Sequence, residues 1–173
     1  MKVIWAPWRM AYIKDDRKPT GCIFCLKAKE RRDAANLLLH RGEYGFVMMN
    51  LFPYNNGHLL VAPYAHVNST EHLPDRSALD MIKLTNLSLK VLRTEMRPDG
   101  FNVGINMGRV GGAGIEEHVH VHIVPRWNGD TNFMPIIAET RVIPEHLQTA
   151  YRKLRARFRL LAPTRSDTLP IHR

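Results

Sequence analysis

The chain has little cysteine and no long apolar run. Only two cysteines occur in 173 residues, which excludes a disulfide-stabilised scaffold. No apolar stretch approaches the roughly 18 residues that a membrane-spanning helix needs, and Pro7 and Arg9 interrupt the N-terminal segment before the apolar region of a signal peptide could form. We therefore expect a cytoplasmic protein without a membrane partner.

The chain also lacks internal repeats and low-complexity tracts. Its length suits one folded unit, and its composition, 45% hydrophobic and 24% charged, is that of an ordinary globular protein. The sequence therefore predicts a single domain over residues 1–173. Within it we expect an aromatic N-terminal extension at residues 1–21 and a C-terminal helix and tail at residues 144–173.

Short apolar segments and turn signals predict a sheet. Asn56-Gly57 is a strong hairpin signal between two apolar segments. The segments expected to form strands are residues 36–41, 44–50, 58–63, 101–107 and 118–124. Because these hairpins are interrupted by one long helical segment, the sequence predicts an α+β fold with an antiparallel sheet of about five strands.

Helical spacing predicts a short helix within residues 22–33, a long helix through residues 76–96 and a C-terminal helix. We expect Asp75 to cap the long helix and Pro98 to Gly100 to end it. The C-terminal helix is expected to begin near Pro144. Its apolar face would comprise Leu147, Ala150, Tyr151, Leu154 and Phe158.

Three histidines alternate with apolar residues in the segment HVHVHIV, residues 118–124. Since successive side chains of a strand point to opposite faces, His118, His120 and His122 would share one face. Two neighbouring histidines of this set could bind one zinc ion. Alternatively, one neutral imidazole could attack phosphorus and form a covalent phosphoramidate, while its neighbours orient the ring and donate protons.

The glycine-rich segment GRVGGAG, residues 108–114, precedes these histidines directly. Glycines allow several backbone N–H groups to face an anion, so this segment is a candidate phosphate-binding loop. It has neither the Walker pattern nor the dinucleotide-binding pattern, and a plain hairpin loop would have the same composition.

The formal net charge of +9 suits a phosphate-rich partner, either a nucleotide or a nucleic acid. Many of the cations lie in the C-terminal segment, where a solvated helix face explains them equally well. Cys22 and Cys25 form a C-x-x-C pair, which is half of a zinc site. A reactive thiol pair and a metal-free packed pair are the alternatives.

Together, the segments HVHVHIV and NLFPYNNGHLLVAPYAH resemble the histidine triad (HIT) family over residues 22–125. Within the family, WAPWRMAYI and PRWNGDTNFMP look most like the bacterial diadenosine tetraphosphate phosphorylases, also called ATP adenylyltransferases. Aromatic packing of Trp5, Trp8 and Trp127 is the alternative explanation for these two segments. The resemblance implies a HIT-like fold and a nucleotidyl-histidine intermediate.

The resemblance also implies roles for single residues. His120 matches the nucleophile, and His118 and His122 match its flanking supports. Asn50 matches a ribose-contacting position and His58 a nucleotide-pocket position, although turn capping could also explain Asn50. The remaining implied phosphate contacts are Asn106, for which turn capping is again the alternative, and the backbone amides of Gly112, Ala113 and Gly114.

One segment departs from the family pattern. Small triad hydrolases and phosphoramidases carry glutamine or serine shortly before the first histidine, whereas this chain has Gly114 followed by Ile115, Glu116 and Glu117. The family's side-chain contact to phosphate therefore does not carry over to this chain, and backbone amides of Gly112 to Gly114 could replace it. His122 stands where the uridylyltransferase branch has glutamine, which disfavours hexose-phosphate chemistry.

For the cysteine pair, the resemblance implies a structural zinc site made of Cys22, Cys25, His66 and His118. It implies no organic cofactor. A zinc ion there would fix His118 and make that residue structural rather than an acid or base.

The resemblance thus implies an enzyme that cleaves diadenosine tetraphosphate with inorganic phosphate to ATP and ADP. The alternative is a hydrolase or phosphoramidase that uses water as acceptor. A nucleic-acid-binding module is disfavoured because it leaves the three histidines unexplained. By family analogy, an edge strand would contact a second subunit in a homodimer or homotetramer.

Overall fold

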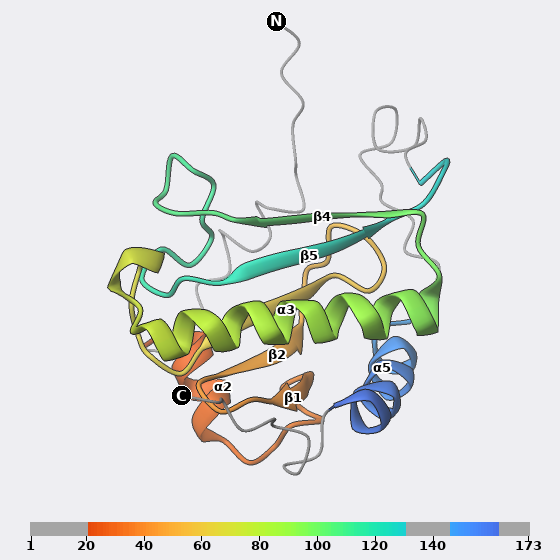
Figure 1. Ribbon diagram of the computed structural model, residues 1–173, viewed down its shortest axis with the longest axis horizontal. Helices are drawn as coiled ribbons and strands as arrows, with labels where there is room; N and C mark the ends of the chain where they lie inside the picture. Colours follow the sequence, from red (N-terminus) through yellow and green to blue (C-terminus); the bar gives the residue numbers. More distant parts are fainter. Residues whose placement is uncertain (1–20, 131–145, 163–173) are drawn as a thin grey trace, which may run out of the picture.

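The computed structural model describes residues 21–130 and 146–162 (Figure 1). The predicted N-terminal extension with Trp5 and Trp8 and the predicted tail after residue 162 lie outside the described residues. The C-terminal helix, predicted to begin near Pro144, begins three residues later at Leu147, with His146 as its N-cap. The division of the chain into one domain with these two flanking parts stays a prediction.

Five antiparallel strands form one sheet in the order β1-β2-β3-β5-β4. The predicted hairpin is confirmed, since β2 pairs with β3 across a turn in which Gly57 has a φ of +73°. The α+β class is confirmed as well. The strands are β1 (Leu38–Arg41), β2 (Gly45–Met49), β3 (Leu59–Pro63), β4 (Gly100–Ile105) and β5 (Val121–Arg126).

The predicted helices are present as α2 (Ile23–Lys29), α3 (Asp75–Met96) and α5 (Leu147–Leu161), with a short 3-10 helix at Thr70–His72. The prediction that Asp75 caps α3 is wrong by one residue. Pro74 is the N-cap and Asp75 is the first helical residue. Its carboxylate there interacts favourably with the positive end of the helix dipole. Among the described residues, no helix combines the length and apolar character needed to cross a membrane.

The two faces of the sheet carry different cores. On one face, α3 and α5 pack against strand residues such as Val47, Val61 and Ile123 (Figure 1). On the other face, Phe24 of α2 packs in a smaller cluster with strand residues that alternate with the first set. These residues are Leu38, Phe46, Met48, Leu60 and Ala62. The C-x-x-C segment therefore lies on the face opposite the two long helices.

The predicted histidine strand is shorter than expected. Regular pairing of β5 begins at Val121, so His118 and His120 precede the ladder. The reason lies in β3, whose last residue Pro63 has no N–H with which to extend the pairing. The carbonyl oxygen of Pro63 accepts a hydrogen bond from the His118 ring at 2.9 Å, and the Val119 N–H donates to Val67 at 2.7 Å.

A carboxylate joins the C-terminal helix to the segment after α2. Asp33 contacts Arg41 at 2.8 Å and Arg155 of α5 at 3.3 Å. Arg41 in turn donates to the carbonyl oxygens of Ala28 and Glu30, at 2.8 and 2.9 Å, which caps the C-terminal end of α2. Asp33 thus holds two arginines that fix three separate segments.

We expect Asp33→Ala to lower the free energy of unfolding by about 1–2 kcal/mol, between the values for exposed and buried ion pairs. The melting temperature should fall by about 2–8 °C. Glu43→Ala, which removes an exposed carboxylate, is the matched control and should cost much less. Equal effects of the two changes would contradict the role given to Asp33.

The contribution of Asp33 should also depend on pH. Burial alone would raise the pKa of its carboxyl, but hydrogen bonds and charge from Arg41 and then Arg155 lower the pKa overall. A lowered folded-state pKa means that the stabilisation is complete above the unfolded pKa, about 4, and is lost as pH falls through the folded value. The stability difference between the wild type and Asp33→Asn, measured by denaturant unfolding, should therefore shrink below about pH 4.

Candidate functional site

The structure brings His58 to the predicted histidine triad. His58 Nε2 lies 3.0 Å from His122 Nδ1, and the His120 and His122 ring centroids are 4.8 Å apart. His58 directly precedes β3 and His122 lies in β5, so the pairing of these two strands sets the contact. Three imidazoles therefore lie in a row on one face of the sheet.

The hydrogen bonds around His58 fix the positions of its proton and that of His122. The Tyr54 backbone N–H can only donate, and it lies 3.0 Å from His58 Nδ1. The Asn50 amide nitrogen lies 3.3 Å from the same atom. His58 Nδ1 is therefore the acceptor, and its Nε2–H donates to His122 Nδ1. As a result, neutral His122 carries its proton on Nε2.

Asn50 also serves the local turn, because its amide oxygen accepts from the Phe52 N–H at 3.0 Å. Asn50 therefore both caps the turn and contacts His58. Tyr54, which sequence reasoning missed, stacks on His122 with ring centroids 5.7 Å apart and an interplanar angle of 13°. The predicted ribose contact of Asn50 stays a prediction.

His120 is held as a neutral imidazole with a defined tautomer. Its Nδ1 lies 2.8 Å from the His118 carbonyl oxygen, which can only accept, so the proton is on Nδ1. The lone pair is then on Nε2. The side chain is 4% exposed, and burial lowers its pKa, which favours the neutral form. A buried neutral imidazole with a free nitrogen lone pair has the form that a nucleophile needs.

His118 contacts the cysteine pair rather than His58 or His122. Its Nε2–H donates to the Pro63 carbonyl oxygen, so the Nδ1 lone pair points away from the strand. This Nδ1 lies 3.3 Å from Cys22 Sγ and 3.6 Å from Cys25 Sγ. Burial lowers the pKa of His118 and so keeps the ring in the neutral form that binds metal.

The predicted zinc ligands come together in space. One donor atom from each of Cys22, Cys25, His66 and His118 lies within 4.8 Å of all the others, and His66 Nδ1 is 3.4 Å from Cys25 Sγ. A tetrahedral zinc ion with ordinary bond lengths separates its sulfur and nitrogen ligands by about 3.5 Å. The donor set and spacings therefore fit zinc. Burial and the neighbouring Cys22 raise the pKa of the Cys25 thiol, an effect that a bound cation would reverse.

The glycine-rich loop is held by its own backbone. The Gly112 N–H donates to Arg109 at 3.0 Å and the Ala113 N–H donates to Gly108 at 3.2 Å. The Asn106 amide donates to the Gly112 carbonyl oxygen at 3.4 Å, which is the turn-capping role. Two of the three predicted phosphate-binding amides are thus occupied within the loop, and Gly114 is the exposed member of the set.

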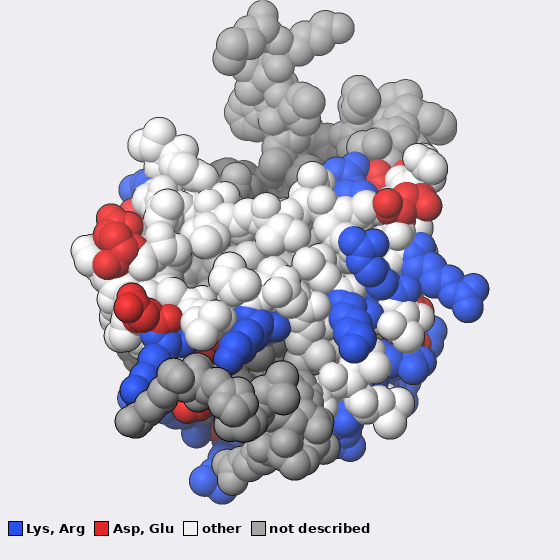
Figure 2. All heavy atoms as spheres, viewed as in Figure 1, with Lys and Arg blue, Asp and Glu red and all other residues white. Residues whose placement is uncertain are grey.

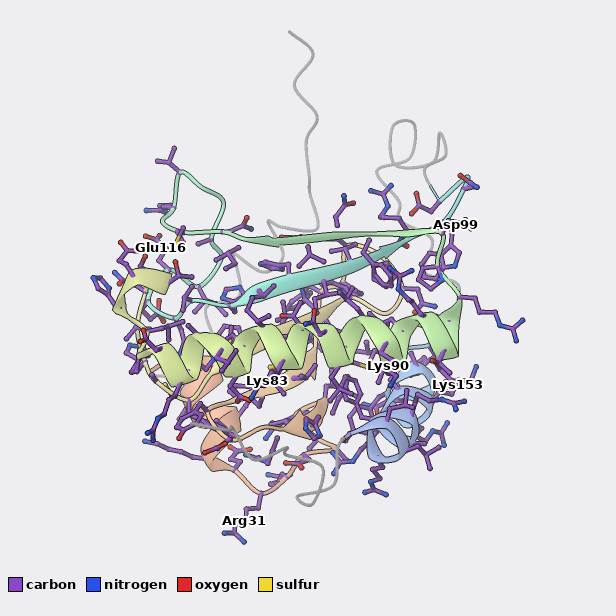
Figure 3. All side chains as sticks on the ribbon, viewed as in Figure 1. Arg31, Lys83, Lys90, Asp99, Glu116 and Lys153 are labelled. Atoms are coloured by element: carbon purple, nitrogen blue, oxygen red, sulfur yellow. The ribbon has the colours of Figure 1, made fainter. Side chains whose placement is uncertain are left out.

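The two glutamates after the loop are exposed, whereas His120 is buried. Glu116 lies at the end of the molecule that carries the glycine-rich loop (Figure 3) and is 4.0 Å from Arg109. The Arg109 and Glu116 side chains are both largely exposed, so this ion pair contributes little to stability.

The basic residues gather elsewhere. Lysines and arginines cluster over the second half of α3 and over α5 (Figure 2), on the face of the sheet opposite the histidines. Exposed members of this group are Lys90, Arg93, Arg97, Arg152 and Lys153. The solvated-helix explanation of the C-terminal cations fits this placement.

Comparison with known proteins places this constellation in a family. The model of the HIT domain matches residues 31–129, more than half of the chain. The chain belongs to the histidine triad family. The predicted family and fold are therefore confirmed, and HIT-family relatives with enzyme names confirm the prediction of an enzyme.

Two curated relatives differ in the activity that their names state. The AP-4-A phosphorylase of Mycobacterium tuberculosis is 37% identical over 158 residues, covering 87% of this chain and 81% of that protein. An adenosine 5'-monophosphoramidase of Schizosaccharomyces pombe is 31% identical over 108 residues, covering 62% of this chain and 76% of that protein.

Solved structures agree with the fold. A zinc-bound histidine triad family protein from Mycobacterium smegmatis superposes with a TM-score of 0.63 at 25% identity, over 82% of this chain and 95% of that chain. A hypothetical histidine triad nucleotide-binding protein from Sulfolobus tokodaii superposes with a TM-score of 0.65 at 23% identity, over 85% and 98% of the two chains.

Proposed function

We propose that this HIT-family enzyme is a nucleotidyltransferase that cleaves dinucleoside polyphosphates, converting diadenosine tetraphosphate and inorganic phosphate to ATP and ADP. The observation that carries the proposal is the 2.8 Å contact between His120 Nδ1 and the His118 carbonyl oxygen, which assigns the proton to Nδ1 and leaves the lone pair on Nε2. The 37% identity to the AP-4-A phosphorylase of Mycobacterium tuberculosis supports the choice of substrate and acceptor.

In the first half-reaction, His120 Nε2 attacks the α-phosphorus of one adenosine. A P–N bond forms, the P–O bond to the rest of the chain breaks, and ATP leaves. In the second half-reaction a phosphate oxygen attacks the same phosphorus, the P–N bond breaks and ADP forms. His120 returns to its neutral state, so the residue is a catalyst and the overall reaction is balanced.

The neighbouring histidines have separate proposed roles. His122 carries its proton on Nε2, because its Nδ1 accepts from His58, and it can therefore donate a hydrogen bond to phosphate oxygens. His58 acts by fixing that tautomer. We place Asn50 at the ribose and the Gly114 amide near the phosphates, with Asn106 shaping the glycine-rich loop.

Cys22, Cys25, His66 and His118 would hold a structural zinc ion. When bound, the ion would tie α2 to the sheet and fix the His118 ring. In that role His118 supports His120 through its carbonyl oxygen and takes no part in proton transfer.

The proposal includes self-association. Among the described strands β4 lies at the edge of the sheet, its residues Val103 and Ile105 are exposed, and a strand in this position can pair with a second subunit. We propose a homodimer or homotetramer, which analytical ultracentrifugation would distinguish from a monomer.

The glycine-rich loop offers a test of phosphate binding. A Cβ atom at Gly111 would collide with the Met107 carbonyl oxygen, so Gly111→Ala must distort the loop. We expect kcat/KM for diadenosine tetraphosphate to fall about 10-fold or more, with little change in melting temperature because the loop is exposed. Val110→Ala, at the exposed loop tip, is the matched control and should behave like the wild type.

The activity itself is tested by chromatographic product analysis. Incubation with diadenosine tetraphosphate should give ATP and ADP only when inorganic phosphate is present. ATP and AMP without phosphate would instead identify the alternative function, a triad hydrolase, and cleavage of adenosine 5'-phosphoramidate alone would identify a phosphoramidase. The similarity to the Schizosaccharomyces pombe adenosine 5'-monophosphoramidase is the observation that supports a phosphoramidase as the second candidate function.

A further inference from the structure

Phe24 occupies an unusual place between the two sites. It is the buried one of the two α2 residues inside the C-x-x-C segment, one position before Cys25 and two after Cys22, and it has no exposed surface. Its ring centroid lies 5.0 Å from that of His118 and 4.7 Å from that of His120, at interplanar angles of 45° and 43°. One side chain thus contacts both the candidate metal ligand and the candidate nucleophile.

The orientation of the His120 ring depends on packing against a neighbouring ring. Its hydrogen bond to the His118 carbonyl oxygen fixes the direction of Nδ1, but one hydrogen bond leaves the tilt of the imidazole about that direction undetermined. Packing against a second ring determines the tilt, and the tilt sets the direction in which the Nε2 lone pair points. Two rings lie close enough to do this, Phe24 at 4.7 Å and His122 at 4.8 Å, and Phe24 is the fully buried one of the two.

We propose that Phe24 is a positioning residue for His120 and that the C-x-x-C segment holds it in place. The inference rests on the proposed function, in which His120 is the nucleophile. Cys22 and Cys25 flank Phe24 and face His118 at 3.3 and 3.6 Å, so fixing the cysteines also fixes the ring between them. The cysteine site then acts on the nucleophile along two paths, through the Phe24 ring and through the His118 carbonyl oxygen.

The chain provides a matched control in Phe46. Phe46 belongs to the same buried cluster, is equally unexposed and lies 6.4 Å from Phe24, but it stacks on Tyr64. Phe46→Leu therefore removes the same number of atoms from the same core as Phe24→Leu. The two variants should lose similar stability and differ in their effect on His120.

The test compares steady-state kinetics with diadenosine tetraphosphate and phosphate. We expect Phe24→Leu to lower kcat about 10- to 100-fold with KM and zinc content near the wild-type values, and Phe46→Leu to keep kcat within about 2-fold. Phe24→Met, which restores length to the side chain, should recover part of kcat and also serves if the leucine variant does not fold. A raised KM with unchanged kcat would overturn the proposal by making Phe24 a wall of the substrate pocket.

A second readout needs no substrate. In protein labelled with ¹⁵N-histidine, NMR should show His120 as a single Nδ1-protonated tautomer in the wild type and in Phe46→Leu, and as an exchanging or mixed form in Phe24→Leu. An unchanged His120 signal in Phe24→Leu would overturn the inference. If the wild type shows neither turnover nor a covalent nucleotidyl adduct, the proposed function fails, and the NMR comparison still decides the positioning role.

Discussion

His120→Ala is expected to lower the turnover of diadenosine tetraphosphate by about 10⁴-fold or more, because removal of a covalent nucleophile eliminates the entire two-step route. The change should leave zinc content unaltered, since Cys22, Cys25, His66 and the His118 ring remain. KM should change little, because the ring contributes to the reaction more than to ground-state binding. Steady-state kinetics together with metal analysis check both expectations.

The matched control is His72→Ala. His72 is an exposed histidine of the 3-10 helix whose Nδ1 lies 3.1 Å from the Asn68 side chain. This variant should turn over like the wild type. If His120→Ala kept more than a small fraction of activity while folding normally, the reaction would have to proceed without a covalent histidine intermediate.

Cys22→Ser should have the second large effect, on metal content and stability. Its Sγ atom lies 3.3 Å from the His118 Nδ1, and serine supplies no thiolate to a zinc ion. At free zinc about 1,000 times the Kd, binding stabilises the folded state by about 4 kcal/mol. Loss of the ion should therefore lower the melting temperature by about 8–16 °C, as calorimetry would measure, and reduce zinc from one ion per chain to almost none.

A chelator distinguishes loss of zinc from a packing defect. Chelation should lower the melting temperature of the wild type to that of Cys22→Ser and should leave the variant unchanged. A variant that retains zinc, or that is destabilised further by the chelator, would contradict the assignment of Cys22 as a ligand.

Most of the fold could be predicted from local patterns. The Asn56-Gly57 turn and the apolar segments beside it predict the β2–β3 hairpin, and the spacing of Leu154 and Phe158 predicts a buried face of α5. The start of β5 could not be predicted. It depends on Pro63, which lies far away in the sequence and ends the pairing on the neighbouring strand.

The functional site could likewise be predicted only in part. The triad and the cysteine pair are visible as sequence motifs, but His66 and His118 could be joined to Cys22 only through the family resemblance, because these residues meet in the folded sheet. Phe24 and Tyr54 were missed for a related reason. Each looks like an ordinary core or turn aromatic until the fold places its ring against a histidine.

The glycine-rich loop illustrates a different limit. Its composition predicts backbone amides facing an anion, and that expectation holds only for amides that the loop does not use itself. Gly112 and Ala113 donate within the loop, which leaves the Gly114 amide as the candidate contact. Composition cannot show which amides bond within the loop and which stay available to an anion. That depends on the backbone conformation, which includes φ angles of +70° at Gly108 and +87° at Gly112.

The central claim is a double displacement through His120, and the stereochemical course at the α-phosphorus tests it most directly. A diadenosine tetraphosphate that carries sulfur at one chiral α-phosphorus would be cleaved with phosphate, and the configuration of the resulting thio-ADP would be assigned by ³¹P NMR. Two successive in-line displacements predict retention of configuration. Inversion would show a single displacement by phosphate, and would contradict a nucleotidyl-histidine intermediate on His120.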